Sequence, residues 1–501
     1  MILSRYTLKN ITAVAPPPDA IFDLPEKVLQ FGTGVLLRGL PDYFIDKANR
    51  QGLFNGRIVV VKSTDTGGSE AFDKQDGLYT LCVRGLDNGQ KIEENLINSS
   101  ISRVLSAKND WKEILQCAHN PHMQIIISNT TEVGIQLVQD DIHKHPPVSY
   151  PGKLLAFLLE RYKAFDGSRQ SGMVIVPTEL IPDNGKKLEG IVLELAHLNG
   201  LDDAFIQWLE NCNYFCNSLV DRIVPGKPDA ASREQLEKQL GYKDELLTMS
   251  EVYRLWAIEG GEHIQSVLSF ASVDEGVVIA PDINLFRELK LRMLNGTHTL
   301  SCGLAWLAGF DTVKHAMDNA AMQNFIAGLM LQEIGAGIPY DVDPQTAAGF
   351  GRKVLDRFAN PSIEHHWINI TMQYTSKMKM RNVPVITTYF KRCNGVPANI
   401  SLGFAAYLLF LKPVAKKQDK YYGEWQGKEY HIQDDFAGYF MDKWNKLSAP
   451  ELVDEVLADT GLWGEDLSAL PGFAQAVKDN INALLTQGVM QTIQQNKKEL
   501  A

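Results

Sequence analysis

Residues 27–34 (KVLQFGTG) are a short apolar strand that runs directly into a glycine turn. Residues 35–49 then have the pattern of a helix, and residues 57–62 (RIVVVK) that of a second strand. A strand, a glycine turn and a helix can form a phosphate cradle, because glycines let the backbone approach a pyrophosphate and the helix N-terminus presents free N–H groups. The usual third glycine is replaced by Leu37, so a plain tight turn is an equally good interpretation of this stretch alone.

Two later apolar runs support the cradle. Residues 123–128 (MQIIIS) are followed by Asn129 and Thr130, and residues 172–177 (GMVIVP) are followed by Thr178 and Glu179. A continuous apolar run that turns polar at its carboxyl end is typical of a buried parallel strand that carries a site at that edge. We therefore predict an α/β domain of the Rossmann-like, dinucleotide-binding type.

The character of the chain changes near Pro281, which follows a last short strand pattern at residues 275–279. Beyond it, helical periodicity recurs at residues 286–298, 312–334, 347–358 and 463–491, with few strand-like runs. We expect a Rossmann-like NAD-binding domain at 1–280 and a mostly α-helical substrate and catalytic domain at 281–501. A cofactor-dependent site is expected where two such domains meet.

Composition narrows the class of protein. A chain of 501 residues, 45% hydrophobic and 22% charged, is typical of a globular protein with two large domains. A net charge of −11 argues against nucleic acid and anionic membranes as partners, although a local cation can still bind an acidic small molecule. The apolar run at residues 400–411 is shorter than the ~20 residues of a membrane span, so we predict a buried helix there. Residues 1–18 lack the pattern of a signal peptide, and a cytoplasmic location is expected.

No residue pattern predicts a metal site or specifies an oligomeric state. Cys212 and Cys216 are one helical turn apart, but no second pair or nearby histidine completes a zinc set, and the six cysteines are expected to be reduced. His365 and His366 are adjacent, which suits neither face of a helix, and no acidic partner set accompanies them. We assign these two histidines a structural role.

Residues 285–302 (LFRELKLRMLNGTHTLSC) place a lysine, an asparagine and a histidine at a spacing that acid–base chemistry can use. If this stretch is an α-helix, Asn295 lies about 140° and His298 about 80° around the helix axis from Lys290, so the three share one broad face. Taken alone, the spacing is explained better by a surface lysine, a capping asparagine and a hydrogen-bonded histidine.

With the rest of the chain, these residues resemble the polyol-specific long-chain dehydrogenase/reductase family, which includes mannitol dehydrogenases and hexuronate reductases. Its signature is a lysine, an asparagine five residues on and a histidine eight residues on, as in Lys290, Asn295 and His298. Further similar segments are residues 30–34 (QFGTG), 75–80 (QDGLYT), 128–132 (SNTTE), 147–151 (PVSYP) and 220–224 (VDRIV). Mannitol-type members carry an asparagine where Leu180 stands here, which favours the hexuronate branch, and some relatives carry an acid where Arg287 stands.

The resemblance implies an NAD-dependent interconversion of D-altronate and D-tagaturonate without a metal. Hydride leaves a secondary alcohol only as its proton is removed, so a base must lie within hydrogen-bond reach of that hydroxyl. Burial and a nearby cationic nicotinamide lower the pKa of a lysine, so Lys290 would take the proton in oxidation and return it in reduction. Asn295 and His298 would donate hydrogen bonds to the developing alkoxide.

The cofactor-binding residues that the resemblance implies are Phe31, Gly32, Thr33, Gly34, Asp65, Asn129 and Thr130. Asn129 and Thr130 would lie near the nicotinamide ribose, although a strand-capping turn explains them as well. Dehydrogenases that use NAD usually end the second strand with an acid for the ribose 2′-OH, and those that use NADP place cations there. Lys62 favours NADP and Asp65 favours NAD, and the resemblance decides for NAD.

The remaining candidates concern the substrate. Asp221 matches a family position near the site and could orient groups or relay protons, with an ion pair to Arg222 as the alternative. Glu179, at the end of its strand, is a substrate-binding candidate. The carboxylate of a sugar acid needs a cation, for which we predict Arg381 first and then Lys377, although a solvated charge run is the commoner explanation.

Other functions stay open at this point. An enzyme on the same scaffold could reduce fructuronate or oxidise a neutral polyol. A protein that binds NADH as a sensor without chemistry belongs to a different class, and it would be expected to lack an intact lysine, asparagine and histidine trio.

Overall fold

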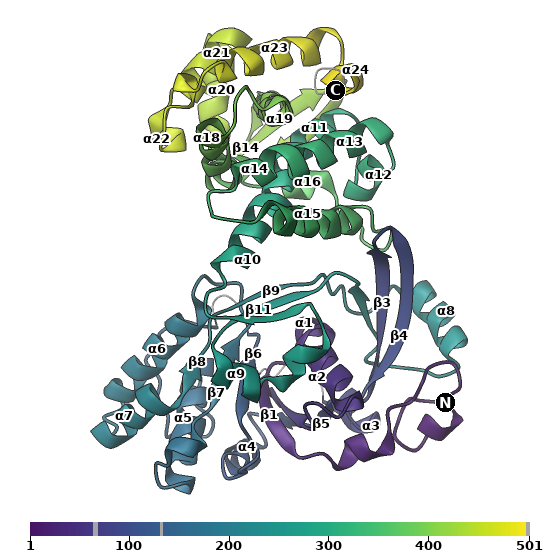
Figure 1. The fold of residues 1–501 in the computed structure, drawn as a ribbon, viewed down its shortest axis with the longest axis vertical. Helices are drawn as coiled ribbons and strands as arrows, with labels where there is room; N and C mark the ends of the chain where they lie inside the picture. Colours follow the sequence, from purple (N-terminus) through teal and green to yellow (C-terminus); the bar gives the residue numbers. More distant parts are fainter. Residues whose placement is uncertain (64–68, 131–133, 497–501) are drawn as a thin grey trace. The chain divides into compact units, whose positions relative to one another are not determined.

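The computed structural model describes residues 1–63, 69–130 and 134–496, so the predicted cofactor residue Asp65 lies outside the described residues. The chain divides into two compact units (Figure 1). The first comprises Met1–Arg84 and Lys91–Ile283, and the second comprises Gly85–Gln90 and Asn284–Ala501. The chain therefore passes between units three times, whereas a single boundary at 280/281 was expected from the sequence.

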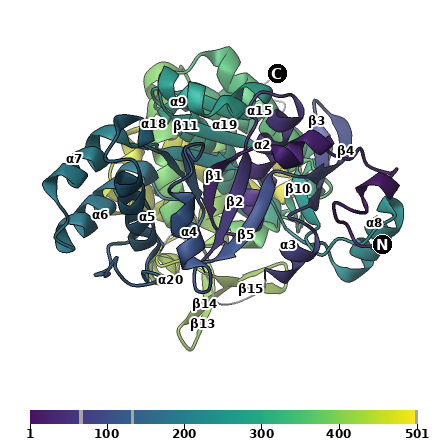
Figure 2. The same cartoon turned by 90° about the horizontal axis from the view of Figure 1, so that it is seen from below.

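A six-stranded parallel sheet forms the centre of the first unit (Figure 2). In spatial order its strands are β5 (Ile101–Ser106), β2 (Arg57–Lys62), β1 (Glu26–Phe31), β6 (Ile125–Ser128), β7 (Val174–Pro177) and β8 (Tyr214–Phe215). Each neighbouring pair is parallel. Counted along the chain within this sheet, the order is 3-2-1-4-5-6, which is that of the doubly wound dinucleotide-binding fold. The predicted Rossmann-like fold is confirmed.

Alternate residues of the central strands enter two separate cores. Leu29 and Val59 pack into one core with helices α4 (Trp111–Cys117), α5 (Tyr150–Ala164), α6 (Asn184–Leu198) and α7 (Asp203–Cys212). Val28 and Val60 face the other core, which contains α1 (Val35–Gly39), α2 (Pro41–Arg50), α3 (Glu70–Lys74) and α9 (Glu262–Val267). Both faces are covered, which explains why the strands are continuous apolar runs in the sequence.

The helix predicted at residues 35–49 is two helices instead of one. Helix α1 ends at Gly39, and α2 begins at Pro41 after Leu40, whose φ and ψ are −131° and −79°. Proline has no N–H and clashes with the preceding turn, so it begins a helix more readily than it continues one.

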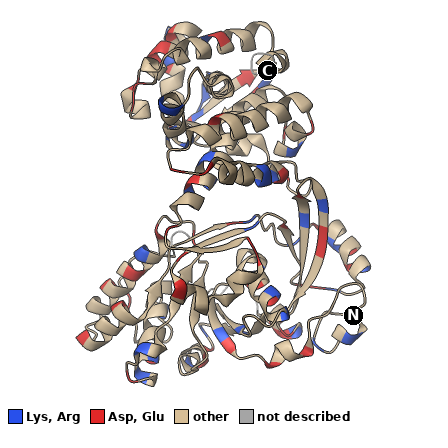
Figure 3. Ribbon diagram, in the orientation of Figure 1, with Lys and Arg blue, Asp and Glu red and all other residues tan. Residues whose placement is uncertain are grey.

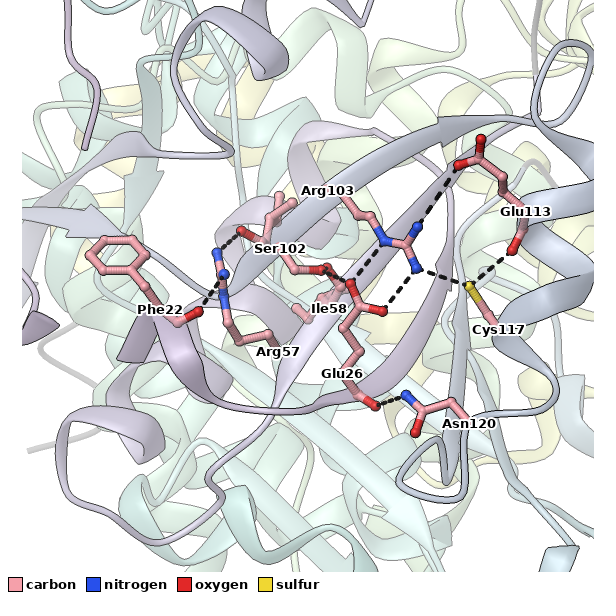
Figure 4. Close-up of polar contacts among 10 residues, drawn as sticks. Phe22, Glu26, Arg57, Ile58, Ser102, Arg103, Glu113, Cys117 and Asn120 are labelled. Carbon is pink, nitrogen blue, oxygen red and sulfur yellow. Dashed lines mark hydrogen bonds and ion pairs between the residues drawn. The ribbon is translucent and has the colours of Figure 1, made fainter. Parts of the chain in front are cut away.

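A polar cluster joins the amino ends of β1 and β5 (Figure 4). The guanidinium of Arg103 donates to both carboxylate oxygens of Glu26 at 2.9 and 3.0 Å, and the Ser102 hydroxyl donates to Glu26 at 2.8 Å. Arg103 also contacts the Cys117 sulfur at 3.5 Å and lies 3.9 Å from Glu113. Burial would raise the pKa of Glu26, but the hydrogen bonds from Arg103 and Ser102 outweigh it and lower that pKa. The cluster holds the sheet together at the edge opposite its carboxyl ends.

Two three-stranded sheets complete the first unit, except that the hairpin tip Gly85–Gln90 between β3 and β4 belongs to the second. One has the order β10 (Thr248–Glu251), β3 (Tyr79–Asp87) and β4 (Gln90–Asn98), and the other β12 (Val277–Ala280), β11 (Leu255–Glu259) and β9 (Ser218–Asp221). Helix α8 (Ala230–Leu240) is largely exposed, as its charged sequence suggests.

The second unit is mostly helical, as predicted. Its helices are α10 (Asn284–Leu289), α11 (Thr297–Leu307), α12 (Val313–Met317), α13 (Ala320–Gly328), α14 (Gly335–Gly337), α15 (Pro344–Phe358), α16 (Trp367–Ile370), α17 (Tyr374–Lys377), α18 (Val383–Arg392), α19 (Ala398–Phe410), α20 (Ala437–Lys446), α21 (Ala449–Leu457), α22 (Thr460–Trp463), α23 (Phe473–Thr486) and α24 (Val489–Asn496). An antiparallel sheet of β13 (Pro413–Lys417), β14 (Lys420–Trp425) and β15 (Lys428–Ile432) follows α19.

Helix α19 lies at the centre of this unit, packed against α11 and α23. Every residue from Asn399 to Phe410 is buried, so the buried helix predicted from the apolar run at 400–411 is confirmed. Among the described residues, no helix combines the length and hydropathy that crossing a bilayer requires. In each unit, basic and acidic residues are interspersed along the ribbon (Figure 3).

Candidate active site

The glycine turn after β1 has the geometry of a cofactor cradle. Gly32 has a φ of +129°, and a Cβ built on it would lie 2.9 Å from the backbone oxygen of Asn129 and from a methyl carbon of Leu37. Only glycine adopts this backbone conformation without strain. Gly34 is the N-cap of α1, and nothing lies within 4 Å of a Cβ built on it. The turn is therefore open on the side where a pyrophosphate would approach the helix N-terminus.

The predicted cofactor residues of β1 and β6 meet at the carboxyl edge of the sheet. Phe31, the last residue of β1, is buried, and its backbone oxygen accepts a hydrogen bond from the N–H of Asn129 at 3.1 Å. The Asn129 amide donates to the hydroxyl of Thr178 at 3.0 Å, which connects the ends of β6 and β7. Thr33, between the two glycines, is half-buried. The first unit thus brings Phe31, Gly32, Asn129 and Thr130 together.

Glu179 accepts hydrogen bonds from residues at this carboxyl edge of the sheet. Its carboxylate accepts from the backbone N–H of Thr130 at 2.8 Å, from the Thr130 hydroxyl at 3.0 Å and from the Ser128 hydroxyl at 3.1 Å. The residue is only 4% exposed. Both carboxylate oxygens are therefore occupied within the protein, and these bonds favour a role in holding the Asn129–Thr130 turn. The substrate contact predicted for Glu179 stays a prediction.

Asp221 lies at the end of β9, in one of the smaller sheets of the first unit, and is 7% exposed. Its neighbour Arg222 is 6% exposed, so both residues are buried, and the ion pair between them stays a prediction. The Arg222 guanidinium donates to the carbonyl oxygens of Gly39 and Glu251 and lies over the ring of Tyr43 at 4.7 Å. Arg222 joins β9 to neighbouring segments.

In the second unit, Lys290 and Asn295 lie in a π-helical segment, Lys290–Gly296, instead of the α-helix expected from the sequence. A π-helix forms i→i+5 hydrogen bonds, so a residue five positions on lies about one turn above the first. Five residues correspond to about 140° of rotation in an α-helix but to about one turn in a π-helix, so Lys290 and Asn295 lie on one face here. Both side chains are half-buried, and α11 continues from Thr297 with His298 as its second residue.

His298 lies in an aromatic pocket. Its imidazole stacks on the ring of Phe358, with centroids 4.1 Å apart and planes at 9°. The rings of His365 and Trp367 lie nearly perpendicular to the imidazole, with centroids 5.1 and 6.0 Å away. Within the described residues, the buried Nε2 atom of His298 has no hydrogen-bond partner. Burial, and then the neighbouring charges of His365, Arg357, Arg381 and Lys377, lower the pKa of His298 well below its usual value.

Arg381 and Lys377, the two cations predicted to bind the substrate carboxylate, are among the charged residues that lower the pKa of His298. A second π-helical segment, Met378–Asn382, carries Arg381 and packs against the first. Arg381 donates to the Thr299 hydroxyl at 3.1 Å and to the Asn295 backbone oxygen at 3.5 Å, while its buried Nε has no partner within the described residues. The Lys377 ammonium donates to the Ile370 carbonyl at 3.0 Å, and burial, followed by the charge of Arg381, lowers its pKa.

Sequence reasoning missed His365, Phe358 and Arg357. The structural role assigned to His365 stays a prediction, and its ring lies 5.1 Å from that of His298. Arg357 and Phe358 end α15, more than fifty residues from His298 in the sequence, and no local pattern indicates that the two segments meet. The only local signal is that aromatic and basic residues gather at positions 357–367.

Within the described residues, no group of three or more histidine, cysteine, aspartate or glutamate side chains is arranged to hold a metal ion. All six cysteines are free.

Comparison with known proteins gives a consistent result for both units. The description "Mannitol dehydrogenase Rossmann domain" matches residues 26–269, and "Mannitol dehydrogenase C-terminal domain" matches residues 282–485. The chain is 36% identical over 480 residues to altronate oxidoreductase of Bacillus subtilis, covering 94% of this chain and 95% of that protein. It is 35% identical over 480 residues to altronate oxidoreductase of Shigella flexneri, covering 94% and 96%.

Two solved structures share the fold over nearly the whole chain. Mannitol 2-dehydrogenase of Pseudomonas fluorescens, solved with NAD and D-mannitol, is 23% identical with a TM-score of 0.65, covering 99% of this chain and 100% of that one. A D-sorbitol dehydrogenase in substrate-free form is 20% identical with a TM-score of 0.76, covering 98% and 100%.

Proposed function

The chain belongs to the mannitol dehydrogenase family and is an oxidoreductase, and we propose that it interconverts D-tagaturonate and D-altronate with NAD as cofactor. The names of its relatives support this substrate pair, since it is 35–36% identical to altronate oxidoreductases over almost their full length. The structural observation that carries the proposal is the set of cations around His298, namely Arg357, Lys377 and Arg381. A sugar acid brings a carboxylate that such a set can bind, and a neutral polyol does not.

The cofactor fits the first unit. Gly32 allows the sharp turn of the backbone, Gly34 leaves room for the approach of a pyrophosphate, and the N-terminus of α1 supplies N–H groups and positive dipole. Thr33 would line the same turn, and Asn129 and Thr130 would contact the nicotinamide half from the carboxyl edge of the sheet. Bound here, the nicotinamide would supply the hydride acceptor for oxidation of the alcohol carbon and, when reduced, the hydride donor for the ketone carbon.

We assign proton transfer to and from the substrate oxygen to Lys290. In the direction of reduction, its ammonium would give a proton to the oxygen of the ketone as that oxygen becomes a hydroxyl, and in oxidation its amine would take the proton back. The Asn295 amide and the His298 Nε2–H would donate hydrogen bonds to the same oxygen while it carries negative charge. The π-helical turn supports proton transfer by Lys290 and hydrogen bonding by Asn295 to the same oxygen, because the two residues lie on one face.

We assign the substrate carboxylate to Lys377 and Arg381. The Nη1 atom of Arg381 holds Thr299 and the backbone of Asn295, and its Nε remains available for a carboxylate oxygen. Asp221 could relay protons or orient groups. A cytoplasmic location is supported by the six free cysteines, since thiols stay reduced in that compartment.

Turnover on three ketoses tests the substrate assignment. NADH oxidation, followed by absorbance, would be compared for tagaturonate, fructuronate and fructose at equal concentration, and repeated with NADPH. We expect kcat/KM to be highest with tagaturonate and NADH. Preference for fructuronate would move the chain to the epimeric hexuronate, and preference for fructose would move it to the polyols, which the exposed Leu180 disfavours. Tight NADH binding without turnover of any ketose would favour a sensor.

A further inference from the structure

The ring of His298 is held by residues outside its own helix. Phe358, the last residue of α15, is 3% exposed and lies parallel to the imidazole at 4.1 Å. His365, from the segment between α15 and α16, meets the same imidazole edge-on, with planes at 81°. The imidazole is thus fixed between a parallel ring and a perpendicular one.

Such packing matters because the orientation of a histidine ring is weakly set by its own torsions. The χ2 angle of histidine is an sp³–sp² torsion, whose energy wells are broad, so the backbone of α11 does not determine the plane of the ring. A parallel aromatic neighbour does determine it, since rotation about χ2 would break the stack and drive the imidazole into the phenyl ring.

The hydrogen-bonding state of His298 indicates what the fixed orientation is for. Its side chain is about nine-tenths buried, and Nε2 has no partner within the described residues. A buried polar atom without a partner is rare and usually has a functional reason. Burial and the surrounding cations also lower the pKa of the imidazole, so at neutral pH it is uncharged and can donate only one hydrogen bond.

We propose that Phe358 is a positioning residue for the reaction, which stacks on the His298 imidazole, with His365 as the second wall, and aims its Nε2–H at the reacting oxygen. Phe358 touches neither substrate nor cofactor in this account. The inference rests on the proposed function for the identity of the substrate, but the stack itself can be measured without any substrate.

The kinetic test compares a variant that loses the ring with one that keeps it. Phe358→Leu removes the stacking partner, and Phe358→Tyr retains an aromatic face. Phe440→Leu is the matched control, because Phe440 is a fully buried phenylalanine of the same unit that packs on Tyr407. We expect kcat with tagaturonate to fall by roughly tenfold to a hundredfold in Phe358→Leu, with KM changed less than about threefold, because a misaimed donor weakens transition-state binding most.

Phe358→Tyr should keep kcat within about threefold of wild type, and Phe440→Leu should lower the melting temperature without lowering kcat. Equal losses of kcat in Phe358→Leu and Phe440→Leu would mean that the effect is general loss of packing, and would overturn the proposal. If Phe358→Leu does not fold, Phe358→Met, which conserves side-chain volume without a ring, takes its place.

A nuclear magnetic resonance experiment tests the stack independently of the substrate. The ring resonances of His298 are identified among the 11 histidines by their loss in His298→Gln. In wild type we expect an upfield-shifted ring signal of a neutral imidazole protonated on Nε2, retained in Phe358→Tyr and lost in Phe358→Leu. An unchanged signal in Phe358→Leu would overturn the proposal. If wild type has no activity on tagaturonate but shows this pattern, the proposed substrate fails and the positioning role of Phe358 stands.

Discussion

Two alanine substitutions in one glycine turn should have different effects, because the two glycines are required for different reasons. In Gly32→Ala the new residue must adopt a φ of +129°, which costs about 1–3 kcal/mol. Its Cβ would also lie 2.9 Å from the backbone oxygen of Asn129, so backbone must move, and overpacking of this kind costs about 1–3 kcal/mol more. We expect the free energy of unfolding to fall by about 3 kcal/mol.

Gly34→Ala should leave stability nearly unchanged. Gly34 has a φ of −64°, which alanine adopts easily, and its Cβ would meet no atom of the protein within 4 Å. Alanine is a poorer N-cap than glycine by a few tenths of a kcal/mol or more, and the reduced freedom of the unfolded chain offsets part of this. The same methyl group occupies the space through which a pyrophosphate approaches the helix, so the dissociation constant of NADH should rise about tenfold or more.

Thermal unfolding followed by circular dichroism and NADH titration followed by fluorescence measure both effects on the same samples. For a loss of about 3 kcal/mol, the melting temperature of Gly32→Ala should fall by roughly 6–12 °C. Wild-type NADH affinity in Gly34→Ala would show that this turn is not the phosphate cradle. A melting temperature of Gly32→Ala within about 1 °C of wild type would refute the argument from backbone strain.

Three further predictions concern pH, ion pairing and substrate charge. Burial raises the pKa of Asp42 from 3.8 to about 8, so the folded protein keeps a proton on this carboxyl that the unfolded chain has already released. Wild type therefore loses stability as pH rises towards 8, whereas an asparagine does not titrate. In urea titrations, Asp42→Asn should gain stability relative to wild type between pH 5 and pH 8.5. Because hydrogen bonds lower the pKa of Glu26 despite its burial, Arg103→Ala should cost about 1 kcal/mol at pH 7, and the cost should fade below pH 4.5 as the carboxylate is protonated; a cost that is constant with pH would contradict the pairing. Lys377→Met should raise KM for tagaturonate about tenfold or more but leave KM for fructose within about twofold. The control Lys379→Met, at an exposed lysine, should change neither KM. Equal effects of Lys377→Met on both ketoses would exclude a carboxylate contact.

The parallel sheet was predictable because its strands are buried on both faces. A continuous apolar run such as residues 57–62 predicts a parallel strand that is buried on both faces. Asn129 and Thr130 lie at the carboxyl edge of the sheet, as expected. The break of the first helix was also readable in principle, since Pro41 stands at the beginning of α2.

The geometry of the second unit could not be derived in the same way. Residues 290–296 form a π-helical turn and pack against a second such segment, Met378–Asn382, which is almost ninety residues later in the chain, and no local sequence pattern distinguishes such a turn from an α-helix. The neighbours of His298 are equally distant, since Phe358 ends another helix and His365 lies in a connection. The sequence therefore offered Lys290, Asn295 and His298 as candidates through a family resemblance, and the packing around His298 became visible only in the structure.

The most direct test of the account is NADH oxidation with tagaturonate by wild type and Lys290→Ala, with NADH affinity measured for both. We predict rapid turnover by wild type, and a loss of at least a hundredfold in kcat for Lys290→Ala with the dissociation constant of NADH unchanged, because the variant lacks the group that supplies the proton. Turnover by Lys290→Ala at nearly the wild-type rate would contradict the account, since the proton would then come from another group.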